Sequence, residues 1–110
     1  MYKQGDILLI PIPFTDLTAS KKRPVLVLSN SLYNKATKDI VVVAITSNVE
    51  SKEYAVLFSK DDMKEGTLKV DSCIRADKIY TLSQDSIVKK FGSINDNVLF
   101  HVKEKISLLL

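Results

Sequence analysis

The longest apolar run in the chain, Ile40–Ile45, is the feature that most restricts how this sequence folds. The run is rich in β-branched residues and shows no alternation of apolar and polar positions, which predicts a central β-strand covered on both faces. It is also far shorter than the roughly 20 apolar residues that a membrane-spanning helix requires. We therefore expect a soluble protein built around a buried strand, with no membrane partner.

Shorter apolar segments, separated by polar connections, recur along the rest of the chain and predict further strands. The first, Ile7–Ile10, is expected to end at Pro11. A second is expected to begin at Pro24, because a missing N–H does least harm at the start of a strand. The polar stretches 14–22 and 30–38 are expected to be loops, and 61–66 a turn or one helical turn closed by glycine. The remaining predicted strands are Tyr54–Phe58, Ser72–Ile74, Lys78–Leu82 and Ile87–Phe91.

The C-terminal segment changes from strand to helix periodicity. Asn95 is a favourable N-cap, and Asp96 suits the positive end of a helix dipole. Apolar residues then follow at helical spacing: Leu99, Val102, Ile106 and Leu109. Short strands with one terminal helix predict a mainly β protein, a small and highly twisted antiparallel barrel. With 110 residues the chain is long enough for one core, so we expect a single domain over residues 1–110.

The composition argues against several classes of function. Cys73 is the only cysteine and His101 the only histidine, so an internal disulfide and a zinc site built from Cys and His are excluded. We expect Cys73 to be a small core residue. Three glycines supply neither a dinucleotide fingerprint nor a phosphate-binding loop. We expect no cofactor and no metal. The N-terminus lacks the pattern of a signal peptide, which leads us to expect a cytoplasmic protein.

Positive charge is concentrated in the first third of the chain. The formal net charge is +3, yet residues 1–38 carry six Lys or Arg against two acidic residues. The segment Lys21–Pro24 enters a predicted strand and Thr46–Asn48 leaves another. Taken alone, these two segments indicate a solvated loop end and ordinary turn chemistry. Composition by itself therefore gives no function.

A family resemblance adds what composition lacks. The segment Gly5–Leu17, followed by Lys21–Ser29, closely resembles the N-terminal signature of the MazF/PemK toxins. Val43–Ser47 and Ser72–Leu82 agree with the same family, so the resemblance covers nearly the whole chain in the right order. It implies an SH3-like antiparallel β-barrel with a C-terminal helix, and a homodimer with an RNA groove across its interface. It also implies a metal-independent endoribonuclease that a cognate antitoxin inhibits.

The resemblance also assigns candidate site residues by position. The catalytic arginine of the family corresponds to Arg23 and its catalytic threonine to Thr46. Lys21 and Lys22 are expected to contact RNA phosphates, and Phe14 is expected either to stack on a base or to be buried beneath its own loop. The remaining candidates for RNA contact are Thr15, Asp16, Ser47, Asn48 and Arg75. An ion pair with Asp77 competes with that role for Arg75.

Such a site needs few residues because RNA supplies its own nucleophile. The ribose 2′-hydroxyl attacks the adjacent phosphorus and leaves a cyclic phosphate and a 5′-hydroxyl. Arg23 is then expected to neutralise charge on the phosphoryl oxygens, and Thr46 to add a hydrogen bond. The general base stays unassigned, with Asp16 or a bound water as candidates. The alternatives are an inactive RNA-binding or protein-binding barrel of the same fold, and a toxin directed at DNA gyrase.

Overall fold

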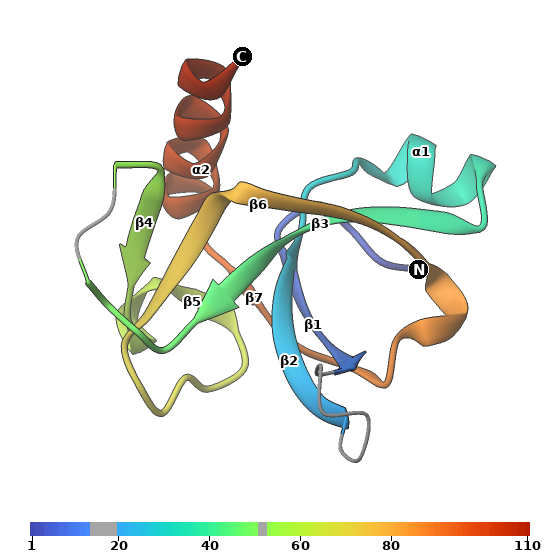
Figure 1. Cartoon of the computed structure of the whole chain (residues 1–110), viewed down its shortest axis with the longest axis horizontal. Coiled ribbons are helices and arrows are strands. Elements are labelled where there is room, and N and C mark those ends of the chain that lie inside the picture. Colours follow the sequence, from blue (N-terminus) through green and yellow to red (C-terminus); the bar gives the residue numbers. More distant parts are fainter. Residues whose placement is uncertain (14–19, 51–52) are drawn as a thin grey trace.

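The strands form one curled antiparallel sheet in the computed structural model of the chain (Figure 1). The structure describes residues 1–13, 20–50 and 53–110, without the side chains of residues 12, 13, 20 and 21. In these ranges the strands are β1 (Asp6–Pro13), β2 (Ser20–Val27), β3 (Asp39–Thr46), β4 (Ala55–Phe58), β5 (Met63–Glu65), β6 (Ser72–Ser83) and β7 (Lys89–Ile94). The helices are α1 (Ser31–Ala36), α2 (Asp96–Leu109) and two 3₁₀ turns, η1 (Lys60–Asp62) and η2 (Gln84–Ser86).

The order of the strands is β4-β6-β3-β2-β1-β7-β5, so the sheet curls into a half-barrel with β4 and β5 at its edges in the described residues. The mainly β class with a C-terminal helix is thus confirmed. Two core clusters lie on opposite faces of the sheet. Neighbouring residues of β3 divide between them: Val43 belongs to the cluster beneath α2 and Val42 to the other, and both are fully buried. The prediction of a central strand covered on both faces is confirmed.

The C-terminal helix follows its predicted start. The Asn95 side chain accepts a hydrogen bond from the N–H of Val98 at 2.9 Å, and Val98 and Val102 are buried against the sheet. Leu99 and Ile106 pack on the same cluster. Leu109 is 41% exposed, so the buried face ends one turn before the helix does. No helix in the described part of the chain has the length and apolarity needed to span a membrane.

The prolines of the first two strands lie deeper in the sheet than predicted. β1 continues through Pro11 and Pro13, and Pro24 lies within β2 rather than at its start. The backbone carbonyl of Leu9 on β1 accepts a hydrogen bond from the N–H of Val88, so the backbone polar groups of Leu9 point toward β7. The backbone positions of Pro11 and Pro13, each two residues further along the strand, point toward the same side. The pairing of β1 with β7 ends at Leu9, so no N–H is needed there.

Three further boundaries differ from the prediction. The two strands expected at 72–74 and 78–82 are one long strand, β6, with a register shift opposite Val43 and Ala44 of β3. The connection 30–38 contains the short helix α1, capped by Asn30. The turn at 61–66 consists of η1 and the short strand β5, and Gly66 closes it with a φ of +83°. Cys73 is buried, as expected.

Candidate RNA-binding pocket on β2, β3 and β6

A pocket of about 230 Å³ lies between β2, β3 and β6. It forms because β3 pairs with only three residues of β2, Val25 to Val27. On the N-terminal side of Val25 the two strands separate. Had the pairing continued in register, Arg23 would lie opposite Thr46. The lining residues are Arg23, Pro24, Ala44, Ile45, Thr46, Arg75, Lys78 and Tyr80.

Pro24 explains why the two strands separate at this point. The N–H of Leu28 donates to the carbonyl of Val41 on β3, so every second residue back along β2, including position 24, faces β3. Proline has no N–H to donate, and the pairing with β3 stops at the next residue, Val25. The pocket therefore begins where the sequence removes a backbone donor.

Thr46 is the last residue of β3 and is partly buried at the pocket wall. Its Oγ1 accepts a hydrogen bond from the N–H of Asn48 at 3.1 Å. Because the hydroxyl oxygen accepts this bond, its own proton is left to donate to a ligand. The Asn48 side chain in turn accepts the N–H of Glu50 at 3.3 Å. This turn fixes the position of the Thr46 hydroxyl at the end of the strand.

Arg75 and Asp77 form a bidentate ion pair on β6. The Nε and Nη2 atoms of Arg75 each lie 2.9 Å from a carboxylate oxygen of Asp77. The hydrogen bond to Arg75 lowers the pKa of Asp77 and raises that of Arg75, although partial burial of the side chains opposes both shifts. The sequence predicted both side chains on one face, and the ion pair is present. It occupies one edge of the guanidinium, so the N–H groups of Nη1 and one of Nη2 lie outside the pair.

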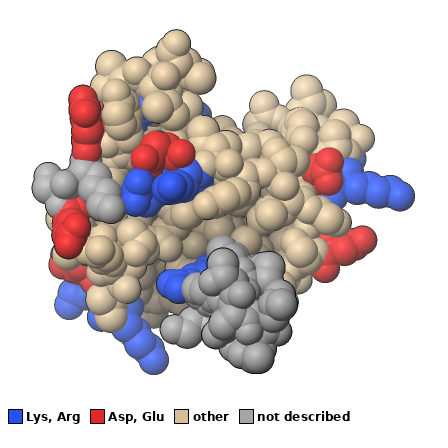
Figure 2. Space-filling view, viewed as in Figure 1, with Lys and Arg blue, Asp and Glu red and all other residues tan. Residues whose placement is uncertain are grey.

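The pocket is electropositive. Among the described residues that line it are three cations, Arg23, Arg75 and Lys78, and no carboxylate. Figure 2 shows basic and acidic side chains together over β6, and further basic side chains beside the grey atoms near the start of β2. The pair with Asp77 reduces the charge of Arg75 without removing its remaining donors. A phosphate group is the ligand chemistry that best matches this lining.

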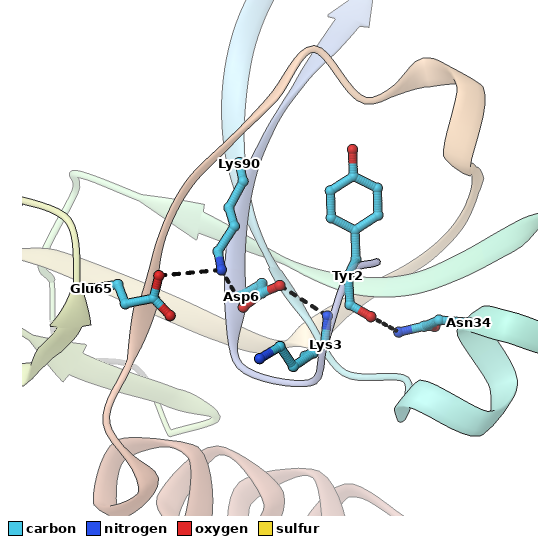
Figure 3. Close-up of polar contacts among 6 residues, drawn as sticks. All are labelled: Tyr2, Lys3, Asp6, Asn34, Glu65 and Lys90. Atoms are coloured by element: carbon cyan, nitrogen blue, oxygen red, sulfur yellow. Dashed lines mark hydrogen bonds and ion pairs between the residues drawn. The ribbon is translucent and has the colours of Figure 1, made fainter.

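A second polar cluster lies on β1 and β7, away from this pocket (Figure 3). The buried carboxylate of Asp6 accepts the N–H of Lys3 at 2.9 Å and pairs with the Lys90 ammonium at 3.4 Å, which also reaches Glu65 at 3.5 Å. Burial alone would lower the pKa of Lys90, but the two carboxylates outweigh it and the pKa is raised. This cluster joins β1, β5 and β7.

Comparison with known proteins identifies the family. Residues 3–110 match the model of the PemK-like, MazF-like toxins of type II toxin–antitoxin systems. The chain belongs to this family. It is 25% identical over 109 residues to the endoribonuclease EndoA of Bacillus subtilis (strain 168), covering 98% of this chain and 93% of EndoA.

Solved structures of MazF-type toxins share the fold of the chain. A MazE–MazF structure from Deinococcus radiodurans aligns with a TM-score of 0.82 at 22% identity, covering 98% of this chain and 94% of that chain. An endoribonuclease from a Mycobacterial species, in complex with its cognate antitoxin, aligns with a TM-score of 0.81 at 18% identity, covering 98% and 93%. The fold that the resemblance to the MazF/PemK toxins implied is therefore confirmed.

The structure brings together some of the site residues that the sequence predicted. Arg23, Thr46 and Arg75, which come from three strands, line the same pocket. Ser47 and Asn48 are exposed directly after Thr46. Lys22 is exposed, and strand alternation directs it to the face opposite Arg23. Its assignment as a phosphate contact stays a prediction. Phe14, Thr15, Asp16 and the side chain of Lys21 lie outside the described residues.

Of the lining residues that were not among the predicted site residues, two have polar side chains, and the other three are Pro24, Ala44 and Ile45. Lys78 lies in the stretch of β6 that the register shift leaves unpaired, Tyr80 lies beyond that stretch and opposite Val42, and both residues line the pocket. The sequence analysis treated 72–74 and 78–82 as separate strands, which left no reason to align Tyr80 with Arg75. Only the spacing of Lys78 and Tyr80 was visible as a signal.

Proposed function

We propose that this chain is the toxin of a type II toxin–antitoxin pair. It acts as a metal-independent, sequence-selective endoribonuclease that cleaves single-stranded RNA, with messenger RNA as the main substrate. The observation that carries the proposal is that Arg23 and Thr46, from neighbouring strands, line one electropositive pocket. The kinship with EndoA, which is named an endoribonuclease, supports the same activity.

The chemistry suits a pocket with donors and cations but no nucleophile of its own. The 2′-hydroxyl of the substrate attacks the adjacent phosphorus, the bond to the 5′-oxygen breaks, and the products are a cyclic phosphate and a 5′-hydroxyl. The protein then has to hold the reacting oxygens in line and to stabilise charge on the phosphoryl oxygens. Both tasks depend on rigid positions, which the interior of β2 at Arg23 and the end of β3 at Thr46 provide.

Arg23 is the group best suited to the phosphoryl oxygens, because a guanidinium offers several fixed donors and stays cationic. A protonated guanidinium has only donors and no acceptor for a further proton, so Arg23 serves as a clamp or as a proton donor to the leaving oxygen. Thr46 adds a neutral hydrogen bond from its hydroxyl, whose oxygen is fixed by the N–H of Asn48. Arg75 contacts RNA through the guanidinium edge that Asp77 leaves unused. The general base stays unassigned.

The charge of the lining is what makes the reaction possible without a metal. A divalent ion would otherwise neutralise the phosphoryl oxygens, and here arginine side chains carry that charge. The proposal therefore requires full activity in the presence of a chelator.

We propose further that the toxin acts in the cytoplasm as a single domain, as a homodimer, and under control of a cognate antitoxin. Relatives with this fold have been solved with MazE and with a cognate antitoxin. Exposed apolar side chains on α2, at the residue directly after it and on β4, which packs against α2, support a partner surface, because exposed apolar patches mark interaction sites. They are Leu57, Phe100, Leu108 and Leu110.

The test is incubation of the purified protein with a long single-stranded RNA in EDTA, followed by mapping of the fragment ends. We expect cleavage that leaves 5′-hydroxyl ends, and no cleavage by Arg23→Ala. Lys35→Ala serves as the matched control, since it removes an exposed cation from the last turn of α1, away from the pocket. It is expected to cleave like the wild type.

Other outcomes favour the alternatives. RNA that is bound but left intact favours an inactive binding barrel, whereas RNA neither bound nor cut favours a toxin directed at DNA gyrase. Cleavage that survives Arg23→Ala would refute the assignment of this pocket.

A further inference from the structure

Besides Phe100 on α2, which is 59% exposed, Tyr80 is the one Phe or Tyr residue in the described part of the chain with a largely exposed ring. It is 44% exposed, whereas Phe58 is 1% exposed and Phe91 packs on the cluster beneath α2. The other tyrosines, Tyr2, Tyr33 and Tyr54, are partly buried. An exposed aromatic ring at the wall of a pocket that three cations line has no evident structural duty.

The local structure of β6 keeps this ring open. Beyond its register shift the strand pairs with β3 on one side only, since β4 pairs with β6 no further than Arg75. All residues from Asp77 to Thr81 are consequently exposed, on both faces of the strand. Tyr80 lies opposite Val42, which is fully buried, so the backbone beneath the ring is held firmly by the core. A flat apolar surface is thus presented on a rigid support.

The neighbours of the ring indicate what it binds. Lys78 lies two residues before it on β6, and Lys78, Arg75 and Arg23 all line the same pocket. An aromatic ring beside several cations is the arrangement by which proteins grip single-stranded nucleic acid: cations bind the phosphates, and the ring stacks on a base. A purely anionic protein segment would use the cations but not the ring.

We propose that Tyr80 stacks on a base of the bound RNA, next to the phosphate held by Arg23, and that Tyr80 and Lys78 together form a nucleotide subsite of the pocket. This inference rests on the proposed function, because it takes RNA to be the ligand. Stacking tolerates every base, so the subsite adds affinity and alignment, and sequence choice comes from other contacts.

The test uses tyrosine fluorescence, which is observable because the chain contains no tryptophan. The probes are a short single-stranded 2′-O-methyl RNA, which cannot be cleaved, and an abasic strand of the same length and charge. The variants are Tyr80→Leu, which removes the ring, and Tyr80→Phe, which keeps it. Tyr33→Phe, on α1, is the matched control, and thermal unfolding verifies that each variant is folded.

We expect the RNA to quench the fluorescence of the wild type and of Tyr33→Phe, and the quenching to disappear in Tyr80→Phe at unchanged affinity. Tyr80→Leu is expected to bind the RNA about 5- to 20-fold more weakly, from the lower part of the range for one stacked base, while binding the abasic strand like the wild type. In the cleavage assay Tyr80→Leu raises KM more than it lowers kcat.

Three results would overturn the inference. One is an affinity of Tyr80→Leu within twofold of the wild type. Another is an equal loss in Tyr80→Phe, which would assign the effect to the hydroxyl group. The third is quenching by an acidic, leucine-rich peptide but not by RNA, which would make the ring a protein-docking group. If the wild type cleaves RNA through Arg23 and any of these holds, only the subsite fails; if Arg23→Ala cleaves normally, the proposed function fails instead.

Discussion

The cluster around Asp6 gives a stability prediction whose size follows from the structure (Figure 3). The Asp6 side chain is 5% exposed, and Lys90 is the cation that pairs with it, at 3.4 Å. Replacing Lys90 with Met keeps the length of the side chain and removes its charge, which leaves the carboxylate with the Lys3 N–H. Breaking a buried ion pair on one side costs about 3–5 kcal/mol.

Two features reduce that figure for Lys90→Met. The ammonium side chain is 34% exposed, so water reaches the cluster, and the ion pair is longer than an optimal charged hydrogen bond. We therefore expect a loss of about 1.5–3 kcal/mol in the free energy of unfolding. For a domain of this size that is a fall of roughly 6–20 °C in Tm. Asp6→Asn in the Lys90→Met background is expected to recover part of the loss, because it removes the uncompensated charge.

The assay is urea unfolding followed by circular dichroism at one fixed protein concentration, because self-association would add to the apparent stability. Glu65→Gln is the control. Its side chain is 58% exposed and accepts the same ammonium at 3.5 Å, so its loss is expected within about 0.5 kcal/mol. The reasoning is refuted if Lys90→Met is as stable as the wild type, or if Glu65→Gln costs as much as Lys90→Met.

Three further predictions concern other contacts. The pKa of Asp77 is lowered in the folded protein, so its ionised form contributes stability above about pH 4, and this stability is lost as the pH falls through the lowered value. Unfolding measured from pH 2 to 7 should show this loss of stability at acidic pH in the wild type and less of it in Asp77→Asn. Thr46→Ser keeps the hydroxyl and is expected to retain cleavage within about tenfold, whereas Thr46→Val is expected to lose roughly 100-fold in kcat, and equal rates would refute the role of the hydroxyl. Gln84 Nε2 donates to carbonyl oxygens of Asn34, Thr37 and Asp39 at 2.8–3.2 Å, so Gln84→Ala should cost about 1–2 kcal/mol in urea unfolding, and an unchanged midpoint would contradict this.

The parts of the fold that depend on local chemistry could be predicted from the sequence. The run Ile40–Ile45 has no polar face, so β3 had to be covered on both sides. Asn95 supplies the side-chain acceptor that begins α2. The family resemblance indicated Arg23 and Thr46, which the structure places in one pocket. For β3 and α2 the signal lies within a few residues of the feature that it predicts, whereas Arg23 and Thr46 were indicated by a resemblance that spans nearly the whole chain.

The boundaries that failed depend on contacts between distant segments. Proline was expected to end or begin strands, but Pro24, whose position faces β3, ends only the pairing with β3 and not β2 itself. Pro11 and Pro13 face the open side of β1, which the sequence does not reveal because it depends on where β7 stops pairing. β6 was divided in two because its middle, from Arg75 to Lys78, is polar, although β3 pairs with both of its halves. The lining residues Lys78 and Tyr80 were missed for the same reason.

Pro24 shows how one residue can shape the sheet and the site together. Its neighbour Val25 is fully buried and pairs with both β1 and β3, so the proline cannot move out of the strand without disrupting the core. Because position 24 faces β3 and has no N–H, the pairing with β3 stops there, while the pairing with β1 continues to Ser20. Arg23 is therefore held by one strand and separated from the next, beside the space that the separation opens. A cation fixed at the rim of such a gap can contact a phosphate without any strand having to separate from its neighbour. The interruption of β2–β3 pairing is therefore what makes the pocket available to a ligand.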